Sequence, residues 1–189
     1  LREPLIPAYL MNEHLEVLWC NDAFGRDLLG GFDPIHDLRQ PPGQSRPRDL
    51  FRLFFRSPAF HMGFAWSALF SFHLGLVKHR FDLVTLTTTY GDLRSAEFGF
   101  LREALEMAVS LEQAPIAETM LDLPTTKQSP TLYKIHAIFF QGGILLLYLP
   151  LGTPNDGLIG SFGQREQAVQ DIMRNRLPML TQLCVFVAD

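Results

Sequence analysis

Histidines, cysteines and short glycine motifs are the parts of this chain that could carry chemistry, and their spacing decides which chemistry to expect. His61, His73 and His79 lie twelve and six positions apart, so none of them forms the i, i+4 pair that puts two metal ligands on one helix face. The sequence has no Cys-x-x-Cys pair, no Gly-x-Ser-x-Gly turn and no Walker loop. It therefore predicts neither a metal site nor an enzyme, although one histidine would suffice as an axial haem ligand.

Glycines and carboxylates in the second half of the chain are weaker candidates. Gly157, Gly160 and Gly163 precede a predicted helix and could bind an anion at its N-terminus, but a linker explains the same spacing. Glu103 and Glu106 fall on the polar face of another predicted helix, where solvation is sufficient to explain them. These residues give no reason to expect catalysis.

Phenylalanine is the residue type that stands out, with 16 copies against 4 Tyr and 2 Trp. A pocket for a hydrophobic ligand needs large apolar walls and a few polar groups that orient the ligand. The stretches 51–72 and 132–149 could supply the walls, and Arg52, His73 or Tyr148 could supply the polar end. The predicted ligand-binding residues are Trp19, Phe51, Arg52, Phe54, Phe55, Phe60, Phe64, Phe70, His73, Phe139, Leu146 and Tyr148. Aromatic residues at helical spacing also build ordinary solid cores, so a filled core is the alternative.

The elements that must position these side chains begin with a predicted hairpin. In PAYLMNEHLEVLWCNDAF (7–24), the polar residues 12–14 separate two apolar runs, which predicts two strands. Asn21 or Asp22 caps a short helix that stops at Gly30-Gly31, and residues 30–49 have the composition of a loop.

The middle of the chain is predicted to be helical. The pattern runs from 50 to 79 with a break at Ser57-Pro58, and Ala68 and Gly75 are small residues there that could leave room for an apolar chain. Residues 81–90 could be a strand or a helix tail. Ser95 is predicted to cap an amphipathic helix that ends by Pro115.

The second half of the chain contains the rest of the predicted sheet. A weak strand at 119–123 precedes TLYKIHAIFF and ILLLYLPL, which flank a short turn at 141–143. Ser161 and Gln164 then have capping-box spacing and open a helix that Pro178 breaks. Strands, then helices, then strands predict an α+β fold: an antiparallel sheet with helices segregated to one face, plus a C-terminal helix. We expect a sensory domain over residues 1–160, and a helix with a linker over 161–189.

Composition sets the broad class. The 189 residues are 47% hydrophobic and 19% charged, and the net charge of −4 argues against a nucleic-acid-binding surface. The two cysteines, Cys20 and Cys184, form no disulfide framework, and no signal peptide is recognisable, so a cytoplasmic chain is expected. Residues 59–77 lack charge and are long enough for a membrane span, but their histidines, serines and glycines favour a buried helix. The chain begins without Met and is expected to be part of a longer protein.

Two segments resemble a known family. PAYLMNEHLEVLWCN (7–21) is similar to the opening of the MmyB-like ligand-binding domain, a PAS-like module of bacterial transcription regulators in which a Pro-Ala pair leads into strands that end in Trp-Asn. RDLFRLFFRSP (48–58) resembles that family's Arg-Asn-Leu-Leu segment, with Asp49 in place of Asn, and Trp66 stands where a Trp is expected in the next helix. The opening departs from the family pattern because Cys20 separates Trp19 from Asn21.

The resemblance implies a PAS-like sheet whose helices enclose a hydrophobic cavity suited to a fatty acid or a similar ligand. It also implies a DNA-binding helix-turn-helix segment that usually precedes the sensor and is absent from this chain. DNA would then be a partner only through that segment, and the chain itself would control a transcription regulator.

The end of the chain leaves other outputs open. TQLCVFVAD (181–189) is similar to the first strand of class III nucleotide cyclase domains, in which an apolar strand ends in a metal-binding Asp. Asp189 would then mark the edge of a catalytic domain, whereas the simpler interpretation is a last element of the sensory unit. A predicted helical stripe suggests a homodimer, because exposed apolar stripes usually mark interfaces; its members are Val169, Ile172, Met173 and Leu177. A ligand-free dimerisation module is the remaining alternative.

Overall fold

The structure is a computed structural model that describes residues 6–31, 48–62, 66–111, 116–123 and 131–152. Its elements, in chain order, are β1 (Ala8–Met11), β2 (Val17–Cys20), the π-helical turn η1 (Phe24–Leu28), α2 (Leu50–Arg56), the 3-10 helix η2 (Pro58–Met62), α3 (Trp66–Leu76), α4 (Leu83–Tyr90), α5 (Ser95–Met107), β3 (Ile116–Leu123), β4 (Thr131–Phe140) and β5 (Gly143–Gly152). The predicted α+β class is therefore confirmed. The predicted C-terminal helix, the boundary at residue 160 and the stripe at 169–177 lie outside the described residues.

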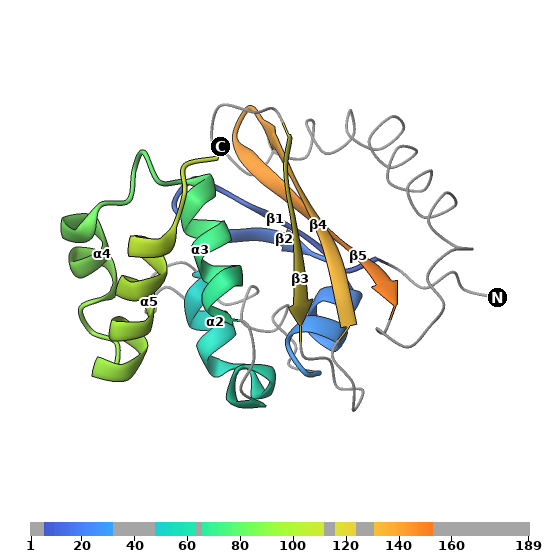
Figure 1. The fold of residues 1–189 in the computed structure, drawn as a ribbon, viewed down its shortest axis with the longest axis horizontal. Helices are drawn as coiled ribbons and strands as arrows, with labels where there is room; N and C mark the ends of the chain where they lie inside the picture. The colour runs from blue at the N-terminus through green and yellow to red at the C-terminus, as the bar shows by residue number, and fades with distance from the viewer. Residues whose placement is uncertain (1–5, 32–47, 63–65, 112–115, 124–130, 153–189) are drawn as a thin grey trace.

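The five strands form one antiparallel sheet in the order β2-β1-β5-β4-β3 (Figure 1). β1 pairs with β5, so the N-terminal hairpin is joined to the strands that come last in the described chain. We expected the first hairpin to form one edge of a sheet whose far half comes from residues 119–151; this is confirmed, with β3 beginning three residues earlier, at Ile116. Gly142, with φ +97°, makes the tight turn between β4 and β5 that the glycines at 142–143 predicted.

Both faces of the sheet are apolar, because alternate residues of each strand point to opposite sides. Tyr9 and Met11 of β1 belong to the large core cluster that includes α2, α3 and α5, and Leu10 belongs to a second cluster. That second cluster consists of the buried residues Ala8, Leu10, Ile138, Leu145, Leu147 and Leu149. In Figure 1, helices α2, α3, α4 and α5 lie together on one side of the sheet, with α3 next to the strands.

Capping side chains explain where the helices begin. Asn21 Oδ1 accepts hydrogen bonds from the backbone N–H groups of Phe24 (3.0 Å) and Ala8 (3.1 Å), so one side chain joins β1 to the turn η1. Asp49 caps α2 and Asp82 caps α4, each accepting from the backbone N–H three positions on.

The structure decides between the two alternatives for residues 81–90 and corrects one predicted helix cap. Asp82 caps a separate helix over residues 83–90, which removes the strand alternative for this stretch. The cap of α5 is Arg94 rather than Ser95, because Glu97 reaches back to the Arg94 backbone N–H at 3.2 Å.

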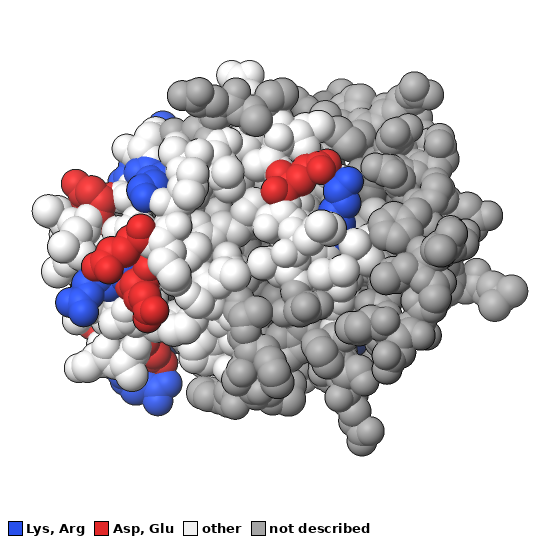
Figure 2. All heavy atoms as spheres, viewed as in Figure 1, with Lys and Arg blue, Asp and Glu red and all other residues white. Residues whose placement is uncertain are grey.

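In the described part of the chain, no helix has the length and apolar character that crossing a membrane requires. Within the uncharged stretch 59–77, η2 ends at Met62 and α3 covers only Trp66–Leu76. On the face shown in Figure 2, most of the charged side chains of the described residues gather over the helical side of the molecule.

Candidate functional site

Two of the three predicted polar-end residues meet in the core between α3 and the sheet. The hydroxyl of Tyr9 on β1 forms a hydrogen bond with His73 Nε2 on α3 and lies 3.0 Å from the hydroxyl of Tyr148 on β5. His73 Nδ1 lies 2.6 Å from the backbone oxygen of Leu69. All three side chains of this Tyr9–His73–Tyr148 cluster are fully buried.

The partners of the imidazole fix the protonation pattern of the cluster. Because the Leu69 carbonyl can only accept, His73 Nδ1 carries the proton and Nε2 accepts from the Tyr9 hydroxyl. Tyr148 can then donate to the Tyr9 oxygen. Burial lowers the pKa of His73 to about 4, and burial also raises the pKa of both tyrosines well above the usual value. At neutral pH the cluster is therefore an uncharged chain of hydrogen bonds.

Aromatic rings from α2 and α3 surround this cluster. Phe51 and Phe54 lie 4.7 Å and 5.6 Å from the ring of Phe70, measured between centroids, and Phe54 lies 6.0 Å from the His73 ring. Phe51, Phe54 and Phe70 are fully buried, as is Leu146 on β5. A fully buried ring has no water-sized space beside it, so a ligand at this place would have to separate these rings.

The remaining predicted wall residues lie further out. Phe55 packs at 4.9 Å from Phe60 and 5.4 Å from Phe70, so these three rings continue the aromatic core. Phe139 is half-buried and lines a surface cleft. Phe64 lies outside the described residues.

Arg52 and Trp19 are not brought to the Tyr9–His73–Tyr148 cluster. Arg52 forms a two-pronged ion pair with Asp92, at 2.6 Å and 3.0 Å, and donates to the Thr89 carbonyl. Its guanidinium thus ties α2 to the end of α4, and Asp92 raises its pKa. Trp19 is 40% exposed and pairs with Leu10, whose side chain belongs to the second cluster on the other face of the sheet.

The suggestion that Ala68 and Gly75 leave room for an apolar chain is wrong. The face of α3 that packs against the core carries Trp66, Phe70 and His73. Ala68 lies on the other side of the helix and is exposed. Gly75 is buried, and a Cβ added there would collide with the backbone oxygen of Val109. Gly75 therefore serves the close approach of the chain after α5.

Sequence reasoning missed Tyr9, which is the central member of the cluster. The signal was present in the alternation of β1, where Tyr9 and Met11 share the face that meets the helices. The sequence could not show that this face meets His73, which lies 64 positions away.

A second candidate is a surface cleft of about 660 Å³ at one end of the sheet. Its lining combines the turn after β1, the end of α3 and the β4–β5 turn: Asn12, Glu13, His14, Leu76, Val77, His79, Phe139, Phe140, Gly142, Gly143 and Ile144. Its volume is in the range of small-molecule sites.

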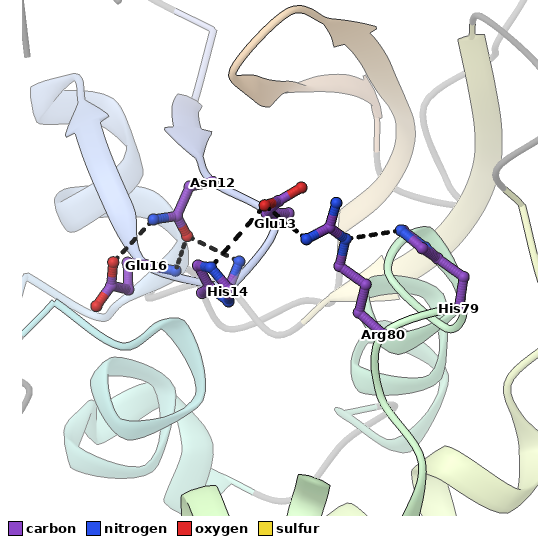
Figure 3. Close-up of polar contacts among 6 residues, drawn as sticks. All are labelled: Asn12, Glu13, His14, Glu16, His79 and Arg80. Carbon is purple, nitrogen blue, oxygen red and sulfur yellow. Dashed lines mark hydrogen bonds and ion pairs between the residues drawn. The ribbon is translucent and has the colours of Figure 1, made fainter. Parts of the chain in front are cut away.

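The polar groups beside this cleft already bind one another (Figure 3). Arg80 Nη1 donates to Glu13 Oε1 at 2.7 Å, and Arg80 Nε donates to His79 Nε2 at 2.8 Å. Asn12 Oδ1 accepts from the backbone N–H groups of His14 and Glu16, which shapes the turn between β1 and β2. The cleft thus has an apolar wall and a rim whose polar contacts hold the turns together.

Comparisons of the chain with protein-family models, with curated proteins and with solved structures give no match. The resemblance to the MmyB-like domain therefore depends on the two quoted segments. In the described residues, no three His, Cys, Asp or Glu side chains gather where they could hold a metal ion.

Proposed function

We propose that this chain is a sensory module with a PAS-like fold that binds a small hydrophobic, fatty-acid-like molecule between α3 and the sheet. The observation that carries the proposal is the Tyr9–His73–Tyr148 cluster, an uncharged set of hydrogen-bonding groups inside an aromatic core. A few polar groups that converge in apolar surroundings are typical of sites that orient a hydrophobic ligand. The order of the five antiparallel strands is consistent with the PAS-like assignment.

Ligand binding in this core would be coupled to movement of α3. Phe70 and His73 belong to α3 and contact rings of α2, so a molecule that enters must shift one helix relative to the other. Each methylene buried contributes roughly 0.8 kcal/mol, and an eight-carbon chain would gain about 6 kcal/mol toward opening the core. A sensor needs this coupling between binding and helix movement. A ligand shifts the balance between two arrangements of α2 and α3 only if it binds one arrangement more tightly than the other.

The attached output domain is a DNA-binding transcription regulator in this proposal, on the strength of the family resemblance. A class III nucleotide cyclase is the alternative output suggested by residues 181–189, which lie outside the described part of the chain. Both outputs use the same sensory mechanism, so they do not change the predictions for the core.

A ligand-free dimerisation module is a second candidate, and one observation favours it. The rings of Phe51, Phe54 and Phe70 are fully buried against one another, as in a filled core.

Titration with a fatty acid separates the two candidates. The purified protein is stripped of bound lipid on a hydrophobic resin and titrated with dodecanoic acid by calorimetry at several temperatures. The sensory proposal predicts saturable one-to-one binding with a negative heat-capacity change, because apolar surface is buried. Absence of saturable binding to a protein that remains folded would favour the filled core.

A further inference from the structure

Trp66 carries a buried polar atom that has no partner. Its side chain is only 5% exposed, and its indole Nε1 is one of the few buried side-chain nitrogens in the described residues that make no hydrogen bond. The nearest aromatic neighbours of the indole are Phe54 at 5.2 Å, Phe60 at 5.7 Å and Phe70 at 6.1 Å, and none of these rings offers an acceptor in its plane. An indole N–H can only donate, and native proteins pair nearly all such groups when they are buried.

Trp66 lies on the same face of α3 as His73 of the candidate site. Trp66, Phe70 and His73 follow one another at i, i+4 and i+7 in α3, which places Trp66 about 10 Å along the helix from His73. The Phe54 ring contacts both ends of this stripe, 5.2 Å from Trp66 and 6.0 Å from His73. A molecule that separated these rings and lay along this face of α3 would extend from the Tyr9–His73–Tyr148 cluster to the Trp66 side chain.

Charge limits what the indole can bind. Helix α3 contains no Lys or Arg, and Arg52 on α2 is bound to Asp92. Arg56 is exposed and has an interaction of its own. A carboxylate buried beside Trp66 would thus lack a cation from these two helices, and burying an unpaired charge is costly.

We propose that the Trp66 indole N–H donates a hydrogen bond to a neutral carbonyl oxygen of the bound molecule. The site would then bind an apolar carbonyl compound, such as a ketone or an ester, more tightly than a free carboxylate with the same chain, which lacks a cation here. This inference rests on the proposed function and narrows its ligand.

The test compares 2-octanone with octane, which has a similar chain and no acceptor, and with octanoate at pH 8. Binding to the full chain is measured by headspace partitioning for the two volatile probes and by calorimetry for octanoate. The parent protein and Trp66→Phe are compared, since Phe keeps the aromatic bulk and removes the N–H. The quantity compared between the two proteins is the ratio of the octane Kd to the 2-octanone Kd. The hydration of each probe is the same in both experiments, so it cancels in this comparison. This ratio is expected to be about tenfold higher for the parent protein than for Trp66→Phe, because one neutral hydrogen bond contributes about that factor to the affinity.

Fluorescence gives a second measurement that does not depend on the stability of Trp66→Phe. The chain has 2 Trp, so Trp19→Phe leaves Trp66 as the single tryptophan, whose emission can be excited apart from that of the 4 Tyr. Because the indole gains a hydrogen bond, 2-octanone should shift its emission to longer wavelength, whereas octane should not.

The outcomes separate this inference from the proposed function. If both volatile probes bind, but the ratio is unchanged in Trp66→Phe and the emission does not shift, the neutral-acceptor inference is wrong and the sensory proposal stands. Octanoate binding more tightly than 2-octanone with the same emission shift would also overturn the inference. If none of the three probes binds to folded protein, both proposals fail.

Discussion

Replacing Tyr9 with Phe tests whether the Tyr9–His73–Tyr148 cluster is as tightly organised as the structure indicates. The change removes the hydroxyl that accepts from Tyr148 and donates to His73 Nε2, so two fully buried polar groups lose a partner. Each buried group left without a partner costs about 1–3 kcal/mol. Tyr148 already lies 3.4 Å from His73 Nε2 and can partly replace the lost bond, so we expect a total loss of about 2–4 kcal/mol.

Tyr148→Phe is the matched control for this prediction. It deletes a buried hydroxyl of the same kind but keeps the bond between Tyr9 and His73, so no donor is left without an acceptor. The expected loss is about 1 kcal/mol, the usual net contribution of one hydrogen bond.

Urea unfolding, followed by far-ultraviolet circular dichroism, measures both variants. The decisive result is that the urea midpoint of Tyr9→Phe lies below that of Tyr148→Phe. The comparison holds if the free energy of unfolding falls with urea concentration at the same slope in both variants and in the parent protein. Tyr148→Phe as destabilising as Tyr9→Phe, or Tyr9→Phe within 0.5 kcal/mol of the parent, would show that the cluster is not arranged in this way.

Two further predictions follow from the same core. Below its ordinary pKa of 6.5, His73 takes up a proton in the unfolded chain but not in the folded one until about pH 4, so the free energy of unfolding should fall by up to about 3 kcal/mol across this range. Urea unfolding measured from pH 7 to pH 4 should show this fall. In His73→Gln, the part of the fall in the free energy of unfolding that comes from His73 should be absent. Gly75→Ala should cost about 1–3 kcal/mol because its Cβ meets the Val109 carbonyl, whereas Gly99→Ala in α5, with open space beside it, should stabilise by about 0.5–1 kcal/mol. Equal effects of the two alanines on the urea midpoint would contradict this packing.

The sequence predicted the elements more successfully than it predicted what their side chains meet. Alternating apolar runs gave the strands, and the break at Ser57-Pro58 separated α2 from the next helix, because these signals are local. Residues 81–90 were ambiguous because a stretch rich in β-branched residues fits a strand or a helix. In the structure Asp82 caps a helix there.

The candidate site could be predicted only in part, for a physical reason. His73 and Tyr148 were predicted as polar ligand-binding residues and lie together in the core, but Tyr9, which joins them, lies 64 positions from His73. Arg52 was predicted to face a ligand, and it pairs with Asp92, 40 positions later. These contacts between residues far apart in the sequence depend on how the helices pack against the sheet and against one another, and no local sequence pattern specifies that packing.

The most direct test of the central claim asks where the hydrophobic molecule binds. Leu146 and Leu145 are adjacent on β5 and both buried, but Leu146 faces α3 and Leu145 belongs to the cluster on the opposite face. Leu146→Ala and Leu145→Ala remove the same atoms and should each destabilise the fold by about 2–5 kcal/mol. The measurement is the affinity of each folded variant for dodecanoic acid. Binding between α3 and the sheet predicts a change of at least fivefold for Leu146→Ala and less than twofold for Leu145→Ala. The claim would be contradicted by the reverse order or by equal affinities.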